Sequence, residues 1–222
     1  MKAGPCVLSR VLVTICLLVS TPVAAVAAVT SGEPVRIGSK TFTESYILAE
    51  IAAQLLESSG IAVERQPGLG GTLIAFEALR NGSIDLYPEY TGTLTQAVLK
   101  TPGLTPSGLE RALSQRGLRL LPPLGFNNSY AIAIDREIAE ANAIERISDL
   151  VVHPELRIGF SHEFLNRKDG WPALRAFYQL PQQPVGIEHA LAYAAIASGQ
   201  LDITDAYTTD GELGVHDLRL LQ

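Results

Sequence analysis

The pattern that decides the fold is VRIGSKTFTESYILAEIAAQLLESSGIAVER at residues 35–65. Residues 35–38 are typical of a short buried strand, and Thr41 and Glu44 have the spacing of a capping box, which predicts that a helix starts at Thr41. Apolar residues at helical spacing continue the helix to Gly60, a C-cap position, and a second strand follows it. The unit is therefore β-α-β, which predicts a parallel sheet with a right-handed crossover.

Strands and helices continue to alternate along the rest of the chain. The predicted strands are 61–65, 84–86, 118–121, 129–134, 156–160 and 201–204, and the predicted helices include 73–80, 107–116, 170–178 and 188–198. Regular structure cannot easily continue through Pro122 and Pro123, so we place a domain crossover there. This division predicts an α/β protein with a first lobe at residues 28–122 and a second lobe at residues 123–222.

Two segments of the sequence repeat each other at a constant offset. AFEALRNGSIDLYPEYT at residues 75–91 and AYAAIASGQLDITDAYT at residues 192–208 share alanine, glycine, aspartate, tyrosine and threonine in register. Each copy predicts a helix, a glycine C-cap, a short strand and a tyrosine, Tyr90 or Tyr207, just past the end of the strand. Ligands of open parallel sheets bind at that end, so we expect the two rings to face each other across a cleft. The alternative is that both tyrosines are packing residues of the core.

The N-terminal segment, residues 1–27, is predicted to be a secretory signal peptide. Lys2 and Arg10 supply the charged n-region, and the apolar run 11–19 follows. Residues 25–27 are Ala-Val-Ala, an A-x-A cleavage signal. A membrane-spanning helix needs about 20 apolar residues, and this run is about half as long. We therefore expect a mature chain that begins near Ala28 and is exported to the periplasm.

Charge and cysteine content exclude several classes of protein. The chain has 17 basic and 23 acidic residues, a net charge of −6 without a basic stripe, so nucleic acid is not an expected partner. Cys6 and Cys16 both lie within the predicted signal peptide, so the mature chain would have no disulfide. A lipid anchor needs a small residue just before the cysteine, and Cys16 follows Thr14 and Ile15, which favours a soluble periplasmic protein over a lipoprotein.

The sequence offers little support for catalysis. It has no G-x-S-x-G nucleophile elbow, no glycine-lysine phosphate loop and no Cys-His metal spacing. The four histidines are scattered, and each is expected to be a surface residue rather than a metal ligand; they are His153, His162, His189 and His216. We therefore expect no catalytic residue, no metal site and no cofactor, and predict that the chain is not an enzyme.

A binding site for a cation fits these residues better. A quaternary ammonium group cannot donate a strong N–H hydrogen bond, so the faces of aromatic rings recognise it. Tyr90 and Tyr207 could supply such rings, and Asn128 and Tyr130 lie just after the crossover, at the expected floor of the cleft. A carboxylate on the same ligand would need a basic partner such as Lys40.

At this point the sequence resembles the substrate-binding proteins of osmoprotectant ABC importers, which bind glycine betaine, choline, carnitine and related compounds. The segments that carry the resemblance are GSKTFTE at 38–44, LGGT at 69–72, IDLYPEYTGT at 84–93, GFNNSY at 125–130, NRKDGW at 166–171 and DAYTTD at 205–210. The resemblance implies a two-lobe, type II periplasmic binding protein fold with the ligand cleft between the lobes. It also implies a monomer that delivers its ligand to an ABC permease in the inner membrane.

The resemblance also implies the residues that contact the ligand. An aromatic cage would use Tyr90, Tyr130 and Tyr207. The polar contacts would be Lys40, Thr93, Asn128 and Arg167, with Lys168 as the alternative to Arg167. Members of the family usually continue into a segment that returns to the first lobe and carries a further tyrosine. This chain stops at Gln222, so that segment is expected to be truncated or absent: either the sequence is cut short, or the cage is incomplete.

Two alternatives remain open at this stage. One is a receptor for amino acids or other small zwitterions, which would need a fixed acid for the ammonium N–H groups in place of three tyrosines. The other is a periplasmic enzyme on the same fold, such as a dehydratase, for which Glu89, Asp205 and Asp210 are the acids expected near the cleft. The sequence does not identify the quaternary ammonium compound or the permease.

Overall fold

The structure is a computed structural model, and it describes residues 32–222. The predicted signal peptide, residues 1–27, lies outside the described residues, so its cleavage stays a prediction. None of the helices within residues 32–222 is both long and apolar enough to cross a lipid bilayer.

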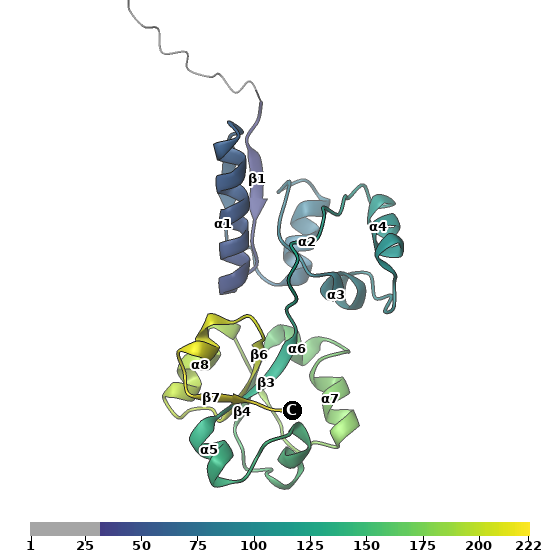
Figure 1. Ribbon diagram of the computed structural model, residues 1–222. Helices are drawn as coiled ribbons and strands as arrows, with labels where there is room; N and C mark the ends of the chain where they lie inside the picture. Colours follow the sequence, from purple (N-terminus) through teal and green to yellow (C-terminus); the bar gives the residue numbers. More distant parts are fainter. Residues whose placement is uncertain (1–31) are drawn as a thin grey trace, which may run out of the picture.

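The elements fall into two groups along the chain, which lie one above the other in Figure 1. The first group is termed the N-terminal lobe and consists of β1 (Val35–Gly38), α1 (Thr43–Ser58), β2 (Val63–Gln66), α2 (Thr72–Arg80), α3 (Thr91–Thr93), the π-helical turn η1 (Leu94–Val98) and α4 (Pro106–Ser114). The second group is termed the C-terminal lobe and consists of β3 (Tyr130–Asp135), α5 (Arg136–Ala141), the 3-10 helix η2 (Ile147–Val152), β4 (Ile158–Ser161), α6 (His162–Asn166), α7 (Trp171–Tyr178), β5 (Val185–Ile187), α8 (His189–Ala197), β6 (Ile203–Tyr207), the 3-10 helix η3 (Gly211–Gly214) and β7 (Leu218–Leu220).

The predicted β-α-β unit of the N-terminal lobe is confirmed. Strands β1 and β2 pair in parallel, from Val35 opposite Val63 to Gly38 opposite Gln66, and α1 connects them. The chain turns at Gly60, whose φ of 79° is a conformation that glycine adopts without steric cost. The helix packs through small buried residues such as Ala49 and Ala53, which allows it to approach the strands closely.

The predicted capping box is wrong. Helix α1 begins at Thr43, and the preceding residue, Phe42, makes no side-chain hydrogen bond to the helix end. The carboxylate of Glu44 instead accepts hydrogen bonds from the Tyr90 hydroxyl and from the Asn128 side chain. Tertiary partners have taken the place of the local cap, and Thr41 is left free to face the space between the lobes.

The C-terminal lobe has a mixed five-stranded sheet in the order β5-β4-β6-β3-β7. Strand β4 pairs in parallel with β5 and β6, as expected of a second α/β unit, whereas β3 is antiparallel to both β6 and β7. The antiparallel register sets Tyr130 directly opposite Tyr207. Helix α8 packs on β4 and β6, and α5 packs on β3 and β7.

The internal repeat has a structural counterpart in both lobes. Asp85 accepts hydrogen bonds from the backbone N–H and the guanidinium of Arg36, at the start of β1. Asp202 accepts the equivalent bonds from Arg157, just before β4. Each repeat therefore joins its own lobe through the same aspartate-arginine contact, which places the chain after it at the same edge of the two lobes.

Two of the predicted strands do not form. Residues 84–86 make only an isolated bridge, between Leu86 and Ile37, and residues 118–121 are without regular structure. The whole segment 115–129 contains no helix or strand and connects the lobes. The predicted boundary at residue 122 falls within this segment and stays a prediction.

Candidate functional site

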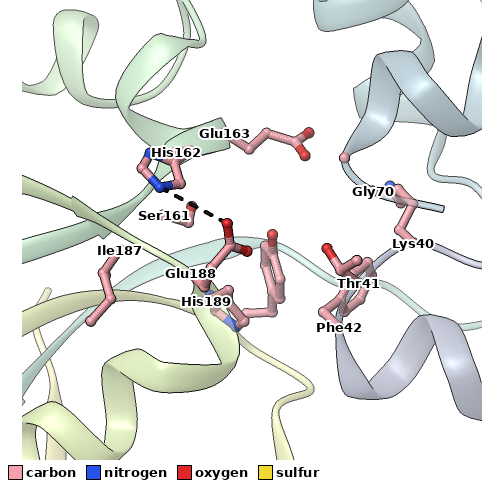
Figure 2. A pocket seen from close by; sticks show the side chains of 12 residues that line it. Lys40, Thr41, Phe42, Gly70, Ser161, His162, Glu163, Ile187, Glu188 and His189 are labelled. Carbon is pink, nitrogen blue, oxygen red and sulfur yellow. Dashed lines mark ion pairs between the residues drawn. The ribbon is translucent and has the colours of Figure 1, made fainter. Parts of the chain in front are cut away.

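A cavity of about 130 Å³ lies where the two lobes meet (Figure 2). The N-terminal lobe lines it with residues 40–42 and 70–71, and the C-terminal lobe with residues 161–163, 187–189 and Tyr207. Pockets for drug-sized ligands measure about 300 to 1,000 Å³, so this space suits a smaller molecule.

An aromatic cluster crosses the lobe boundary beside this cavity. The Phe42 ring of the N-terminal lobe lies 5.1 Å from the Tyr207 ring, centroid to centroid, and 6.3 Å from the Tyr90 ring. Within the C-terminal lobe, Tyr130 and Tyr207 are 5.2 Å apart. Of the four rings, Phe42 and Tyr207 line the cavity, and Tyr90 and Tyr130 pack beside them.

Lys40 is buried at the turn between β1 and α1. Its backbone N–H donates to the Ser45 hydroxyl at 2.8 Å, which fixes the turn. Its ammonium group donates to Glu89 at 2.7 Å, in an ion pair whose side chains are each only 6% exposed. The same ammonium lies 5.5 Å from the centroid of Phe42 and 5.1 Å from that of Tyr90. The ring cluster therefore already accommodates one cation of the protein itself.

Tyr90 and Asn128 converge on one carboxylate, that of Glu44. Burial, together with the hydrogen bond to Glu44, raises the pKa of the Tyr90 hydroxyl well above its usual value, so Tyr90 is a neutral donor. The Asn128 side chain donates to Glu44 at 3.0 Å, and its buried carbonyl oxygen, Oδ1, has no hydrogen-bond partner among residues 32–222.

Arg167 and Thr93 form one of the polar bridges between the lobes. The Arg167 guanidinium donates to the Thr93 hydroxyl at 3.2 Å and lies 5.3 Å from the centroid of the Tyr130 ring. Its main partner is Asp169, at 2.6 Å. Burial opposes the charge of Arg167, but the hydrogen bond and the charge of Asp169 outweigh it and raise the pKa of the guanidinium.

Glu163 makes a second polar bridge. It lies on α6, whose first turn is capped by the Ser161 hydroxyl, and it accepts a hydrogen bond from the Thr72 hydroxyl of the N-terminal lobe at 2.6 Å. Thr72 also lies 3.4 Å from the ammonium of Lys40. A connected set of polar groups thus runs from Lys40 across the lobe boundary to Glu163.

The His189 side chain is only 10% exposed and packs against the aromatic cluster, contrary to the expectation of a surface histidine. Its ring lies 4.3 Å from the Tyr207 ring, and its Nε2 lies 2.9 Å from Asp210. Burial opposes the charged form, but the hydrogen bond to Asp210 and the charges of Asp210 and Asp205 outweigh it and raise the pKa of His189 above 6.5. The wall of the cavity behind Tyr207 is therefore a network of ionisable groups.

The seven predicted ligand contacts gather at this junction but do not all reach the cavity. Lys40 and Tyr207 line it, and the other five lie around it: Tyr90, Thr93, Asn128, Tyr130 and Arg167. Their role as ligand contacts stays a prediction. Lys168, the alternative to Arg167, is exposed, whereas Arg167 is buried.

Sequence reasoning missed three residues of the site. Phe42 was hidden in the misread capping box, although its position at the carboxyl end of a strand was a usable signal. Glu163 directly follows His162, for which only the roles of surface residue and metal ligand were considered from the sequence. His189 had no local signal, because its burial depends on contacts with Tyr207 and Asp210.

The site combines ring faces with carboxylates. Within the part of the chain that the structure describes, there is no group of three or more histidine, cysteine, aspartate and glutamate side chains that could hold a metal ion. Ring faces and carboxylates both attract cations, so the arrangement can hold a small, positively charged molecule.

Comparison with known proteins identifies a matching protein family and related sequences. The family described as the substrate-binding domain of ABC-type glycine betaine transport system matches residues 33–222. The chain is 35% identical over 218 residues to the glycine-betaine-binding protein of Pseudomonas aeruginosa, covering 88% of this chain and 68% of that protein. It is 34% identical over 197 residues to the ergothioneine transport permease/ergothioneine binding protein EgtU of Helicobacter pylori, covering 86% of this chain and 36% of that protein. The chain thus spans only part of the length of these curated relatives.

Among solved structures, the chain is similar to apo YehZ from Escherichia coli. The TM-score is 0.56 at 28% sequence identity, and the match covers 86% of this chain and 75% of that chain. The prediction of a two-lobe α/β periplasmic binding protein fold is confirmed.

Proposed function

The chain belongs to the family of substrate-binding domains of ABC-type glycine betaine transport systems, and from this premise we propose that it captures a small quaternary ammonium compound in the cavity between its lobes. The observation that carries the proposal is that Phe42 and Tyr207, one ring from each lobe, pack at 5.1 Å and line that cavity. A trimethylammonium group held there would contact both rings and so tie the two lobes together.

The proposal gives the remaining predicted residues supporting roles. Tyr90 and Tyr130 pack beside Phe42 and Tyr207 and reach the ligand only when the lobes rearrange, because neither lines the cavity in this structure. The polar contacts proposed for a hydroxyl or carboxylate group of the ligand are Lys40, Thr93, Asn128 and Arg167. The protein acts as a monomer in the periplasm and passes its ligand to an ABC permease, with hinge closure as the signal.

The three acids considered for the enzyme alternative are all engaged in contacts within the protein. Glu89 is paired with Lys40, and Asp210 accepts hydrogen bonds from Tyr193 at 2.5 Å and from His189. Asp205 is fully buried and accepts two hydrogen bonds from Ser161. These acids hold the fold together, so none is available for proton transfer to a ligand in the cavity.

The amino-acid alternative is favoured by two carboxylates that line the cavity, those of Glu163 and Glu188. A fixed acid can accept hydrogen bonds from a primary ammonium, which a trimethylammonium cannot donate. A comparison of methylated with unmethylated ligands therefore separates the two readings.

We expect trimethylated compounds to bind at least about tenfold more tightly than their unmethylated counterparts, because N–H groups facing rings lack acceptors and add a desolvation cost. The measurement is a calorimetric titration of the full chain with glycine betaine against glycine and with choline against ethanolamine. Glycine or ethanolamine binding as tightly as its trimethylated partner would contradict the proposal and favour the amino-acid reading.

A further inference from the structure

Three basic side chains beside the cavity each have a carboxylate partner of their own. These pairs are Lys40 with Glu89 at 2.7 Å, Arg167 with Asp169 at 2.6 Å and His189 with Asp210 at 2.9 Å. A carboxylate brought in by a ligand would have to displace one of these protein carboxylates before it could form an ion pair. Displacing Glu89 would be especially unfavourable, because its pair with Lys40 is almost fully buried.

Glu163 differs from these paired acids, and also from Glu188, the other acid that lines the cavity: the Glu188 side chain is 65% exposed to solvent, against 25% for Glu163. Its Oε1 accepts the hydrogen bond from Thr72, and the nearest cation, the Arg167 guanidinium, lies 3.7 Å away and is already paired with Asp169. Its other oxygen, Oε2, has no hydrogen-bond donor among residues 32–222. Figure 2 shows the carboxylate reaching from α6 across the cavity toward Gly70 and Lys40.

We propose that Glu163 selects ligands by their net charge, so that the cavity binds a quaternary ammonium cation that has no carboxylate of its own. The inference rests on the proposed function and refines its ligand class. The carboxylate of Glu163 attracts the ammonium group of any such ligand, but it repels a ligand carboxylate confined to the same cavity of about 130 Å³. Glu163 therefore attracts the ammonium end of a zwitterion and repels its carboxylate end, whereas it only attracts a monocation.

Choline and glycine betaine are the probes for this proposal, because both carry a trimethylammonium group and differ in net charge. In calorimetric titrations of the full chain, we expect choline to bind about tenfold or more tightly than glycine betaine at low ionic strength. The Glu163→Gln variant keeps an acceptor for Thr72 but removes the charge, so the preference should fall to about threefold or less.

A matched variant controls for the change in overall charge. Glu137 is an exposed acid on α5 of the same lobe, away from the cavity, and Glu137→Gln should leave the choline preference unchanged. Equal or tighter binding of glycine betaine by the unaltered chain would overturn the proposal, as would a preference that Glu163→Gln does not reduce. Binding of neither compound would overturn the proposed function, and this inference with it.

Discussion

Replacing Glu89 with alanine is expected to lower the free energy of unfolding by about 3 to 5 kcal/mol, because it leaves the buried ammonium of Lys40 without a counter-charge. Glu89 accepts hydrogen bonds from Lys40 at 2.7 Å, from the Tyr87 hydroxyl at 3.2 Å and from the backbone N–H of Tyr90 at 2.9 Å. All three donors would lose their acceptor together. Chemical denaturation at neutral pH, followed by circular dichroism, measures the change.

Glu77 provides the matched control. Its ion pair with Arg80 joins side chains that are 52% and 54% exposed, so Glu77→Ala should cost no more than about 1 kcal/mol. The double variant Lys40→Met, Glu89→Leu removes both buried charges and should recover most of the stability lost by Glu89→Ala. If Glu89→Ala proved no more destabilising than Glu77→Ala, the buried pair would not have the role assigned to it.

Replacing Tyr207 with alanine is expected to weaken ligand binding by about 1 to 3 kcal/mol, which combines the loss of a cation–π contact with the loss of apolar contact area. Tyr207→Phe should weaken binding much less, because the face of the ring and not its hydroxyl contacts the cation. Isothermal titration of the full chain with choline or glycine betaine, whichever binds more tightly, measures both effects.

The competing interpretation is that Tyr207 only fills the core. In that case Tyr207→Ala would lower the melting temperature of the ligand-free protein and leave the affinity per folded molecule unchanged. Tyr178, on α7, packs against the C-terminal core and does not line the cavity. Tyr178→Ala is therefore the control, and it should lower the melting temperature without changing the affinity. A Tyr207→Ala variant that behaved in the same way would contradict the binding role.

Local patterns in the sequence were sufficient for much of the fold. The strand, helix and glycine turn from Val35 to Gly60 are encoded by neighbouring residues, and the prediction of a parallel β-α-β unit was correct. The prediction of a strand at 84–86 was wrong, because this segment pairs with the N-terminal sheet only through a single bridge to Ile37. The antiparallel direction of β3 depends on how the chain returns from the first lobe, which no local pattern records.

From residue patterns alone, only the part of the site that belongs to the internal repeat was predictable. The repeat located Tyr90 and Tyr207 near the same edge of the two lobes, and Tyr207 does line the cavity. Phe42 and His189 escaped notice because their importance comes from packing on Tyr207 across long distances in the sequence. The predicted partners of a ligand carboxylate are a different case, since the sequence could not show that the structure would pair Lys40 with Glu89.

The central claim is that rings at the junction of the lobes hold a ligand through its positive charge. The most direct test compares choline with 3,3-dimethylbutan-1-ol, in which a neutral carbon replaces the quaternary nitrogen and the shape is kept, by calorimetric titration of the full chain. We expect choline to bind at least about tenfold more tightly, since each desolvated ring face contributes about 0.5 to 2 kcal/mol to a cation and little to a neutral group. Equal affinity for the two compounds would show that the cavity recognises only an apolar shape, which would contradict the account.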